Sequence, residues 1–262
     1  MKNIHTIFSN WNDLQVSTLK MHGISIEEGY YNLNIEEDET YWKVKPYFDK
    51  WKVSDSVVSK FSDQEIGEAK LLILLSPWAN GYPMPDDDYG YRKTTYDDTD
   101  YCNTCGIGLI QKEPFRLKKL PSWGNKKMFS LNWIYDEMFV KKDSYKSVFK
   151  PIGIKGEKVL LHKKEAVIED TAQLIIPETD VALNLEGYSY QVCKDCNRKR
   201  YDLINKGFFP PFEHNTNNTY IFKSKEWFGT GANGRKYIFI SADLRKELIR
   251  FKVKANYIPC SK

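Results

Sequence analysis

Apolar and polar residues alternate in TYWKVKPYF at residues 40–48, and this period of two predicts a β-strand. The later segment SDQEIGEAKLLILL, at residues 62–75, predicts a short helix, because Ser62 and Glu65 form the S-x-x-E pattern of a capping box. Pro77 is expected to stop that element, since proline lacks the amide that a continuing helix needs. The pattern therefore predicts short strands and helices in the first hundred residues.

A weak internal repeat follows later in the chain. FVKKDSYKSVFK at residues 139–150 aligns without a gap with FISADLRKELIR at residues 239–250, an offset of 100. After a slip of one residue the match continues, with Lys155 against Lys254. Each copy predicts a strand, a short helix and a β-rich tail, which indicates a duplicated α+β unit.

The second copy carries the clearer helix signals. The strand KYIFI is followed by Ser241, whose hydroxyl is expected to cap a helix. Leu244, Leu248 and Ile249 then form the apolar stripe of that helix.

Charge divides the chain at about residue 100. Residues 1–101 hold 10 Lys and Arg against 18 Asp and Glu, a net charge of −8, whereas residues 102–262 hold 29 against 17, a net charge of +12. This division is compatible with an acidic partner-facing surface, a basic nucleic-acid face, or two regions that attract each other. We expect an acidic N-terminal α+β region at residues 1–100 and a second region at residues 101–262.

The predicted fold is α+β, with antiparallel sheets and short helices. Two related strand–helix–strand units are expected at about residues 128–162 and 219–260. The N-terminal sequence has no apolar core of signal-peptide length, and the longest apolar run, at residues 71–75, is too short to cross a membrane. A cytoplasmic location without a membrane partner is therefore expected.

Four of the five cysteines fall into two C-x-x-C pairs. Cys102 and Cys105 lie in YCNTCGIG, and Cys193 and Cys196 lie in VCKDCN. One tight turn of this spacing places two sulfurs at neighbouring corners of a tetrahedron, and Gly or Asn after the second Cys tolerates the left-handed backbone of the turn. The pairs predict a split four-cysteine zinc ribbon, with one structural Zn²⁺ that clamps the duplicated units together.

Other uses of the thiols remain as alternatives. A redox C-x-x-C pair normally precedes a helix, but GIG after Cys105 is a poor helix start. Unpaired structural thiols are the other alternative, and Cys260 is expected to be a buried small hydrophobe. Four thiolates leave no open position for catalysis by zinc, and no nucleophile–base pair can be placed. We therefore expect neither an enzyme nor a small-molecule substrate.

The segment GYPMPDDDYGYRKTTYDDTDY at residues 81–101 is dense in Pro, Gly, Asp and Tyr and predicts a loop. It lacks the residue order of an EF-hand calcium loop. One interpretation is an exposed acidic loop, and the other is a docking surface for a basic partner, since Tyr is favoured at interfaces. The partner-binding residues of this hypothesis are Asp86, Asp87, Asp88, Tyr89, Tyr91, Tyr96, Asp97 and Asp98.

Two more motifs suggest ligands. GTGANG at residues 229–234 satisfies G-x-G-x-x-G, but the β-like RKYIFI follows it, so a hairpin loop is expected instead of a dinucleotide site. CNRKR at residues 196–200 could grip phosphates beside a zinc knuckle, although a solvated basic turn is the plainer interpretation.

The CxxCG knuckle, the long spacer with its FVK-type strand and short helix, the second CxxC, and the closing TYIFKSKEWF…YIFISADLRKELIRFKVKANYIPC together resemble the double-CXXCG motif proteins, known best from myxobacteria. The resemblance covers roughly residues 101–262. It departs at Asn197, which replaces the glycine of the second knuckle. Through this resemblance the implied zinc ligands are Cys102, Cys105, Cys193 and Cys196.

The resemblance also implies an immunity function. Such proteins of polymorphic toxin systems bind a cognate toxin domain and protect the producing cell, so the expected partner is a cognate bacterial toxin. The alternative hypothesis is a zinc-ribbon protein that binds nucleic acid through the basic C-terminal half, with binding that weakens steeply with salt.

Overall fold

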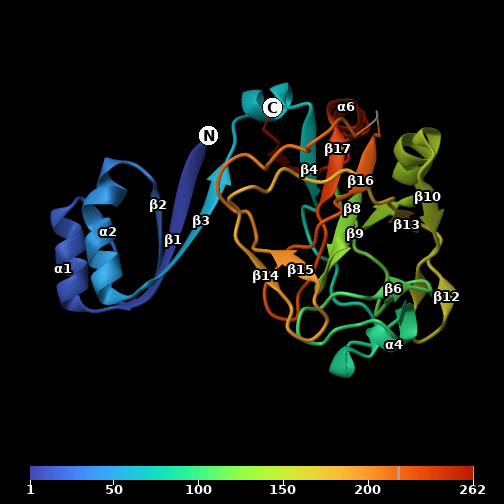
Figure 1. Ribbon diagram of the computed structural model, residues 1–262, viewed down its shortest axis with the longest axis horizontal. Helices are drawn as coiled ribbons and strands as arrows, with labels where there is room; N and C mark the ends of the chain where they lie inside the picture. The colour runs from blue at the N-terminus through green and yellow to red at the C-terminus, as the bar shows by residue number, and fades with distance from the viewer. Residues whose placement is uncertain (217–218, 262) are drawn as a thin grey trace. The chain divides into compact units, whose positions relative to one another are not determined.

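In the computed structural model, which describes residues 1–216 and 219–261, the chain forms two compact units (Figure 1). The first unit comprises residues 1–66 and 204–208, and the second comprises the rest of the chain. The division thus lies at residue 66 instead of the expected residue 100. The difference arises because the apolar strand at residues 71–75 pairs with strands from the C-terminal part of the chain.

The first unit is a three-stranded antiparallel sheet with two helices. The central strand β1 pairs with β2 on one side and with β3 on the other. Its core joins Ile7 and Trp11 of β1 to Val44 and Phe48 of α2. The elements are β1 (Lys2–Trp11), α1 (Asp13–Met21), β2 (Gly29–Glu36), α2 (Glu39–Trp51) and β3 (Ser54–Lys60).

The strand predicted for TYWKVKPYF is wrong, because this segment lies in helix α2. Tyr41, Val44 and Phe48 are buried at spacings of three and four residues, which is the period of a helix face. The Asp38 carboxylate caps the helix by accepting a hydrogen bond from the Thr40 amide at 2.8 Å.

The helix predicted for SDQEIGEAKLLILL is confirmed only in its first part, α3 (Asp63–Glu68). The Glu65 amide donates to Ser62 Oγ at 3.2 Å and the Ser62 amide donates to Glu65 Oε2 at 2.8 Å, so the capping box is present. LLILL forms strand β4 (Leu71–Leu75). Its three central residues are fully buried, as in a strand covered on both faces.

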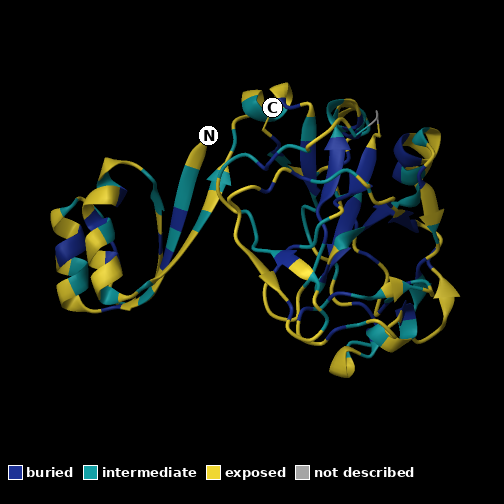
Figure 2. Cartoon of the chain, viewed as in Figure 1, coloured by how far each residue is buried: buried dark blue, intermediate teal, exposed yellow. Residues whose placement is uncertain are grey.

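The second unit contains two four-stranded antiparallel sheets of the same topology, where the buried residues of this unit concentrate (Figure 2). One sheet has the order β8-β9-β13-β10, and the other has the order β16-β17-β4-β18. Each contains a hairpin, a third strand, and an edge strand that follows a helical segment. The strands are β8 (Met128–Leu131), β9 (Ile134–Lys141), β10 (Lys155–Glu157), β13 (Thr171–Ile175), β16 (Ile221–Lys223), β17 (Ile238–Ser241) and β18 (Asn256–Pro259).

Stacked rings mark equivalent positions in the two hairpins. Phe129 lies opposite Phe139, with ring centroids 5.1 Å apart and an interplanar angle of 10°. Phe222 lies opposite Phe239, with centroids 5.6 Å apart and an angle of 14°. The predicted pair of related strand–helix–strand units is therefore confirmed.

The third strand is exchanged between the two copies. Each copy begins with the strand that precedes its C-x-x-C pair, which is β4 in the first copy and β13 in the second. β4 pairs with β17 of the second copy, whereas β13 pairs with β9 of the first copy. After each exchanged strand the chain returns to its own copy, through parallel bridges from Ala79 to Ser130 and from Glu178 to Lys223. Neither sheet is complete without a strand from the other copy.

The alignment predicted for the tail of the repeat is wrong. Lys155 lies opposite Ile175, and Asn256 lies opposite the equivalent Leu75. Lys155 therefore corresponds to Asn256 and not to Lys254. The connection between the two strands holds 13 residues in the first copy (142–154) and 14 in the second (242–255), which shifts the tail by one residue beyond the offset of 100. Its helical segments are α5 (Lys142–Ser144), η2 (Tyr145–Phe149) and η3 (Lys150–Ile152) in the first copy, and α6 (Ala242–Arg250) in the second.

Short elements complete the second unit. No helix in the described ranges is both long enough and apolar enough to span a bilayer. The remaining elements are η1 (Asp87–Tyr89), α4 (Tyr91–Thr95), β5 (Tyr96–Asp97), β6 (Ile110–Gln111), β7 (Arg116–Leu117), β11 (Leu160–Leu161), β12 (Ala166–Val167), β14 (Tyr190–Val192) and β15 (Lys199–Tyr201).

Candidate functional site

The two C-x-x-C segments form the same turn. In the first, the Gly106 amide donates to the Cys102 carbonyl at 2.8 Å, and in the second the Asn197 amide donates to the Cys193 carbonyl at 2.8 Å. Gly106 and Asn197 have φ angles of 75° and 60°, in the left-handed region. The turn conformation expected from these two residue types is therefore present in both copies.

The four sulfurs converge between the two turns. The Cys102 and Cys193 sulfurs are 3.6 Å apart, as are those of Cys105 and Cys196, and all four lie within 4.8 Å of one another. A tetrahedron with metal–sulfur bonds of about 2.3 Å has sulfur–sulfur edges of about 3.8 Å. The four thiols thus fit a tetrahedral metal ion, and the structure brings together the whole predicted ligand set.

The two thiols of the first turn differ in acidity. Donation from the amide of Cys105, and also from that of Thr104, lowers the pKa of the Cys102 thiol to about 7. Burial raises the pKa of the Cys105 thiol to about 12. Because a metal binds thiolates, binding would release the Cys105 proton and would depend on pH.

Basic residues after the second pair contact the first C-x-x-C segment and a neighbouring ring. Arg198 Nη1 donates to the Ile107 carbonyl at 2.9 Å, and Arg200 Nη1 donates to the Cys105 carbonyl at 2.8 Å. The Lys199 ammonium lies 3.8 Å from the centre of the Tyr190 ring. Arg200 is buried and Arg198 half-buried, whereas Lys199 is exposed. The two arginines of CNRKR thus bind the backbone of the first C-x-x-C segment.

The glycine-rich GTGANG is a loop between β16 and β17, as predicted, with no helix after it. It packs against the first turn: a Cβ added to Gly106 would lie 2.4 Å from the Ala232 carbonyl oxygen. A Cβ added to Gly234 would lie 2.9 Å from the Cys105 carbonyl oxygen. Its glycines permit close approach to the metal site.

The predicted partner surface divides into exposed and buried residues. Tyr91 and Tyr96 are only 3% and 6% exposed and pack in a core cluster with Phe115, so their rings cannot form a docking surface. Asp86 is half-buried, with its carboxylate 3.9 Å from the Lys118 ammonium. The exposed members are Asp87, Asp88, Tyr89, Asp97 and Asp98.

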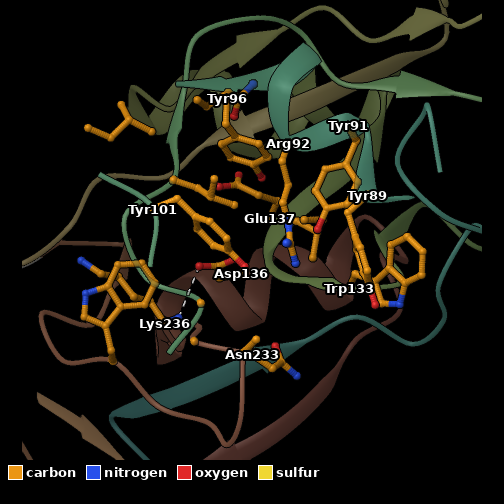
Figure 3. A pocket seen from close by; sticks show the side chains of 18 of the residues that line it. Tyr89, Tyr91, Arg92, Tyr96, Tyr101, Trp133, Asp136, Glu137, Asn233 and Lys236 are labelled. Carbon is orange, nitrogen blue, oxygen red and sulfur yellow. Dashed lines mark hydrogen bonds between the residues drawn. The ribbon is translucent and has the colours of Figure 1, made fainter. Parts of the chain in front are cut away.

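The buried tyrosines line a cavity of about 520 Å³ that the sequence did not reveal (Figure 3). Its other walls carry charged side chains, among them Arg92, Asp136 and Glu137. The one sequence signal is the repeat, which sets Asp136 against Lys236 at the offset of 100.

The metal site and the cavity are both built from equivalent segments of the two copies. Comparison of the chain with known proteins finds no matching family model, no matching curated protein and no matching solved structure.

Proposed function

We propose that the protein is a cytoplasmic immunity protein that binds and neutralises a cognate bacterial toxin, with one structural zinc ion. The observation that carries the proposal is the closed group of four cysteines, contributed equally by two equivalent turns. This arrangement supports the resemblance to double-CXXCG motif proteins, because both of their knuckles are present.

A zinc ion held by four cysteines is structural rather than catalytic. Four thiolates fill a tetrahedral coordination shell and leave no position for substrate. Three of the four cysteines are buried. A metal here would join two turns that are 91 residues apart and would stabilise the folded second unit.

The toxin-binding surface is proposed to be the exposed acidic part of residues 87–98. Four carboxylates, of Asp87, Asp88, Asp97 and Asp98, are exposed on this short segment, and the Tyr89 side chain is 45% exposed among them. Nuclease toxins are often basic, and complementary charge accelerates association with such a partner.

The test is protection of bacteria that also express the toxin domain encoded beside the gene. Asp→Asn replacement at the four exposed acidic positions should abolish protection and slow association with the toxin at low salt. Deleting the segment is unsuitable, since Tyr91 and Tyr96 belong to the core.

The matched control replaces four exposed Asp residues elsewhere, Asp13, Asp63, Asp143 and Asp180, with Asn. It removes the same number of negative charges and should preserve protection. Full protection by the first variant would reject the acidic surface. Absence of any complex between the wild-type protein and the toxin would reject the immunity function itself.

A further inference from the structure

The cavity lies where the two copies meet. Asp136 and Lys236 are equivalent residues of β9 and of the segment before β17, and the Lys236 amide donates to Asp136 Oδ2 at 3.3 Å. The neighbouring equivalent pair is also in contact, with the Arg235 guanidinium 4.7 Å from the centre of the Tyr135 ring. Equivalent residues of the two copies are thus in contact at this cavity.

Acidic and basic side chains line this cavity together. β9 supplies the acids Asp136 and Glu137, Lys223 lies in β16, and Lys236 lies just before β17. Glu137 and Lys223 form a buried ion pair at 2.5 Å, and Lys236 pairs with Glu178. Burial raises the pKa of Glu137. Burial alone would lower the pKa of Lys223, but the Glu137 carboxylate beside it outweighs this effect, and the pKa of Lys223 is raised. Both pairs are therefore satisfied without a ligand.

Two charged groups in the cavity have no ion-pair partner within the described part of the chain. The Arg92 guanidinium extends from α4 into the cavity, 4.4 Å and 4.7 Å from the ring centres of Tyr89 and Tyr101 (Figure 3). The Asp136 carboxylate accepts a hydrogen bond from the backbone amide of Lys236. Arg92 Nε and the Tyr101 hydroxyl are buried and, among the described residues, lack hydrogen-bond partners. Buried polar groups of this kind normally have a partner, and a bound ligand can supply it.

Aromatic rings complete the walls. Trp133 lies against Tyr89 with ring centroids 4.6 Å apart, and Trp227 lines the same cavity. Trp133 has φ +68°, a left-handed conformation that a bulky side chain adopts at a cost of about 1–2 kcal/mol. Its strained position in the β8–β9 turn directs the indole to the cavity, and such strain is concentrated at ligand sites.

We propose that this cavity binds a free α-amino acid with an apolar or aromatic side chain. The ammonium group lies on the Asp136 carboxylate, the carboxylate lies on Arg92 and the Tyr101 hydroxyl, and the side chain packs against the aromatic walls. An anionic ligand would leave the Asp136 carboxylate without an ion pair, and a cationic ligand would leave the Arg92 guanidinium without one. A zwitterion satisfies both, and the volume is within the usual range of about 300–1,000 Å³ for small-molecule sites.

The experiment uses the full, metal-loaded chain and three probes: L-phenylalanine, phenethylamine, which lacks the carboxylate, and 3-phenylpropionate, which lacks the ammonium group. Calorimetry and the intrinsic tryptophan fluorescence, to which Trp133 and Trp227 of the cavity contribute, report binding. L-phenylalanine should bind at least about tenfold more tightly than either analogue, since each charged hydrogen bond contributes about 1.5–3 kcal/mol.

Two variants assign the two ends of the ligand. Asp136→Asn should remove the advantage of L-phenylalanine over 3-phenylpropionate and leave the affinity for 3-phenylpropionate unchanged. Arg92→Gln should remove the advantage over phenethylamine. Should Arg92→Gln unfold, Arg92→Lys keeps the cation and should retain part of the carboxylate preference. Asp180→Asn, at an exposed carboxylate outside the cavity, should bind all three probes as the wild type does.

The inference is overturned if none of the twenty standard amino acids gives heat or a fluorescence change at about 10 mM, a concentration that would detect even millimolar affinity. It is also overturned if the three probes bind equally, or if Asp136→Asn weakens all three alike. The last result would mean that Asp136 only supports the Lys236 backbone.

Discussion

The residue that follows each C-x-x-C pair controls the shape of the turn that presents the sulfurs. Gly106 and Asn197 occupy the same left-handed position, yet their surroundings differ. At Gly106 the Ala232 carbonyl leaves no room for a side chain, whereas Asn197 already carries one. The two turns therefore share a backbone conformation, but only at Gly106 does the surrounding packing also require the absence of a side chain.

Gly106→Ala is expected to lower the free energy of unfolding by about 1–3 kcal/mol, because its Cβ would meet both a strained φ and the Ala232 oxygen. Asn197→Gly should change it by less than about 1 kcal/mol, since glycine adopts the same φ freely. Denaturant unfolding of the metal-loaded variants measures both. Equal effects at the two positions would contradict the role of the Ala232 contact.

Cys193→Ser should reduce bound metal from about one ion per chain to nearly none, because three thiolates and a hydroxyl hold zinc far less tightly. Cys260→Ala is the matched control: this buried thiol lies outside the four-cysteine group, and burial raises its pKa to about 12. Elemental analysis of the purified variants provides the measurement. Metal loss from the Cys260 variant would show that the ligand set is wrong.

Much of this site could be predicted from residue types alone, because C-x-x-C followed by Gly or Asn encodes a local turn. The packing partners could not. Arg198 and Arg200 resemble a phosphate-binding run in the sequence, but long-range contacts turn both guanidinium groups toward carbonyl oxygens of the first turn. The cavity was missed for the same reason, since its charged residues lie far apart along the chain.

At the scale of the element, α6 shows how capping and a buried face define a helix. The Leu244 amide donates to Ser241 Oγ at 3.2 Å, so the predicted cap is confirmed. Of the predicted apolar stripe, Leu244 and Leu248 are buried, while Ile249 is 54% exposed. The helix therefore depends on a narrow apolar face.

Leu248→Ala should destabilise the second unit by about 2–5 kcal/mol, as expected for truncating a fully buried leucine. Ile249→Ala, one position along the same helix, should cost less than about 1 kcal/mol because most of its side chain remains in water. Chemical denaturation compares the two. A larger loss for Ile249 would mean that the exposed face of α6 is covered in solution.

Exposed aromatic residues explain the wrong strand prediction in the first unit. Trp42 is 56% exposed on α2, but in the sequence it lengthens an apparent alternation with Val44.

The exchange of β4 and β13 could not be predicted from the sequence for a different reason. LLILL and TAQLI share little, because Gln173 is buried in β13 where its amide donates to Glu137 at 3.1 Å. β13 takes part in a polar network, whereas the equivalent strand β4 is wholly apolar. A comparison of hydrophobic patterns therefore does not align the two strands.

At the scale of the whole molecule, the first unit is built from two separate segments of the chain. Residues 204–208 follow the second C-x-x-C pair but belong to the first unit. There the Lys206 ammonium lies 2.8 Å from Glu37 Oε2, and the Gly207 amide donates to Ser59 Oγ at 2.7 Å. The first unit is thus completed by a segment that follows Cys196, the last residue of the four-cysteine group.

The hydrogen bond from Lys206 lowers the pKa of Glu37 below its ordinary value of 4.5. The contact therefore stabilises the first unit above about pH 4.5, and this contribution is lost as the pH falls through the lower, folded-state pKa. Lys206→Met should raise the Glu37 pKa toward 4.5, as NMR titration would show. The stability difference from the wild type should close in acid, whereas the exposed Lys60→Met should leave the Glu37 pKa unchanged.

Removal of the metal should separate the stabilities of the two units. The four sulfurs come from both copies, and the exchanged strands join the same copies into one core, so loss of the metal should weaken β9 and β17 together. The first unit has its own core around Trp11 and Phe48 and none of the cysteines. Hydrogen exchange with a strong zinc chelator should therefore increase in both sheets of the second unit, while β1 keeps its protection. The Cys193→Ser variant should show this faster hydrogen exchange without chelator, and adding chelator should change it no further. Equal loss of protection in both units would contradict independent folding of the first unit.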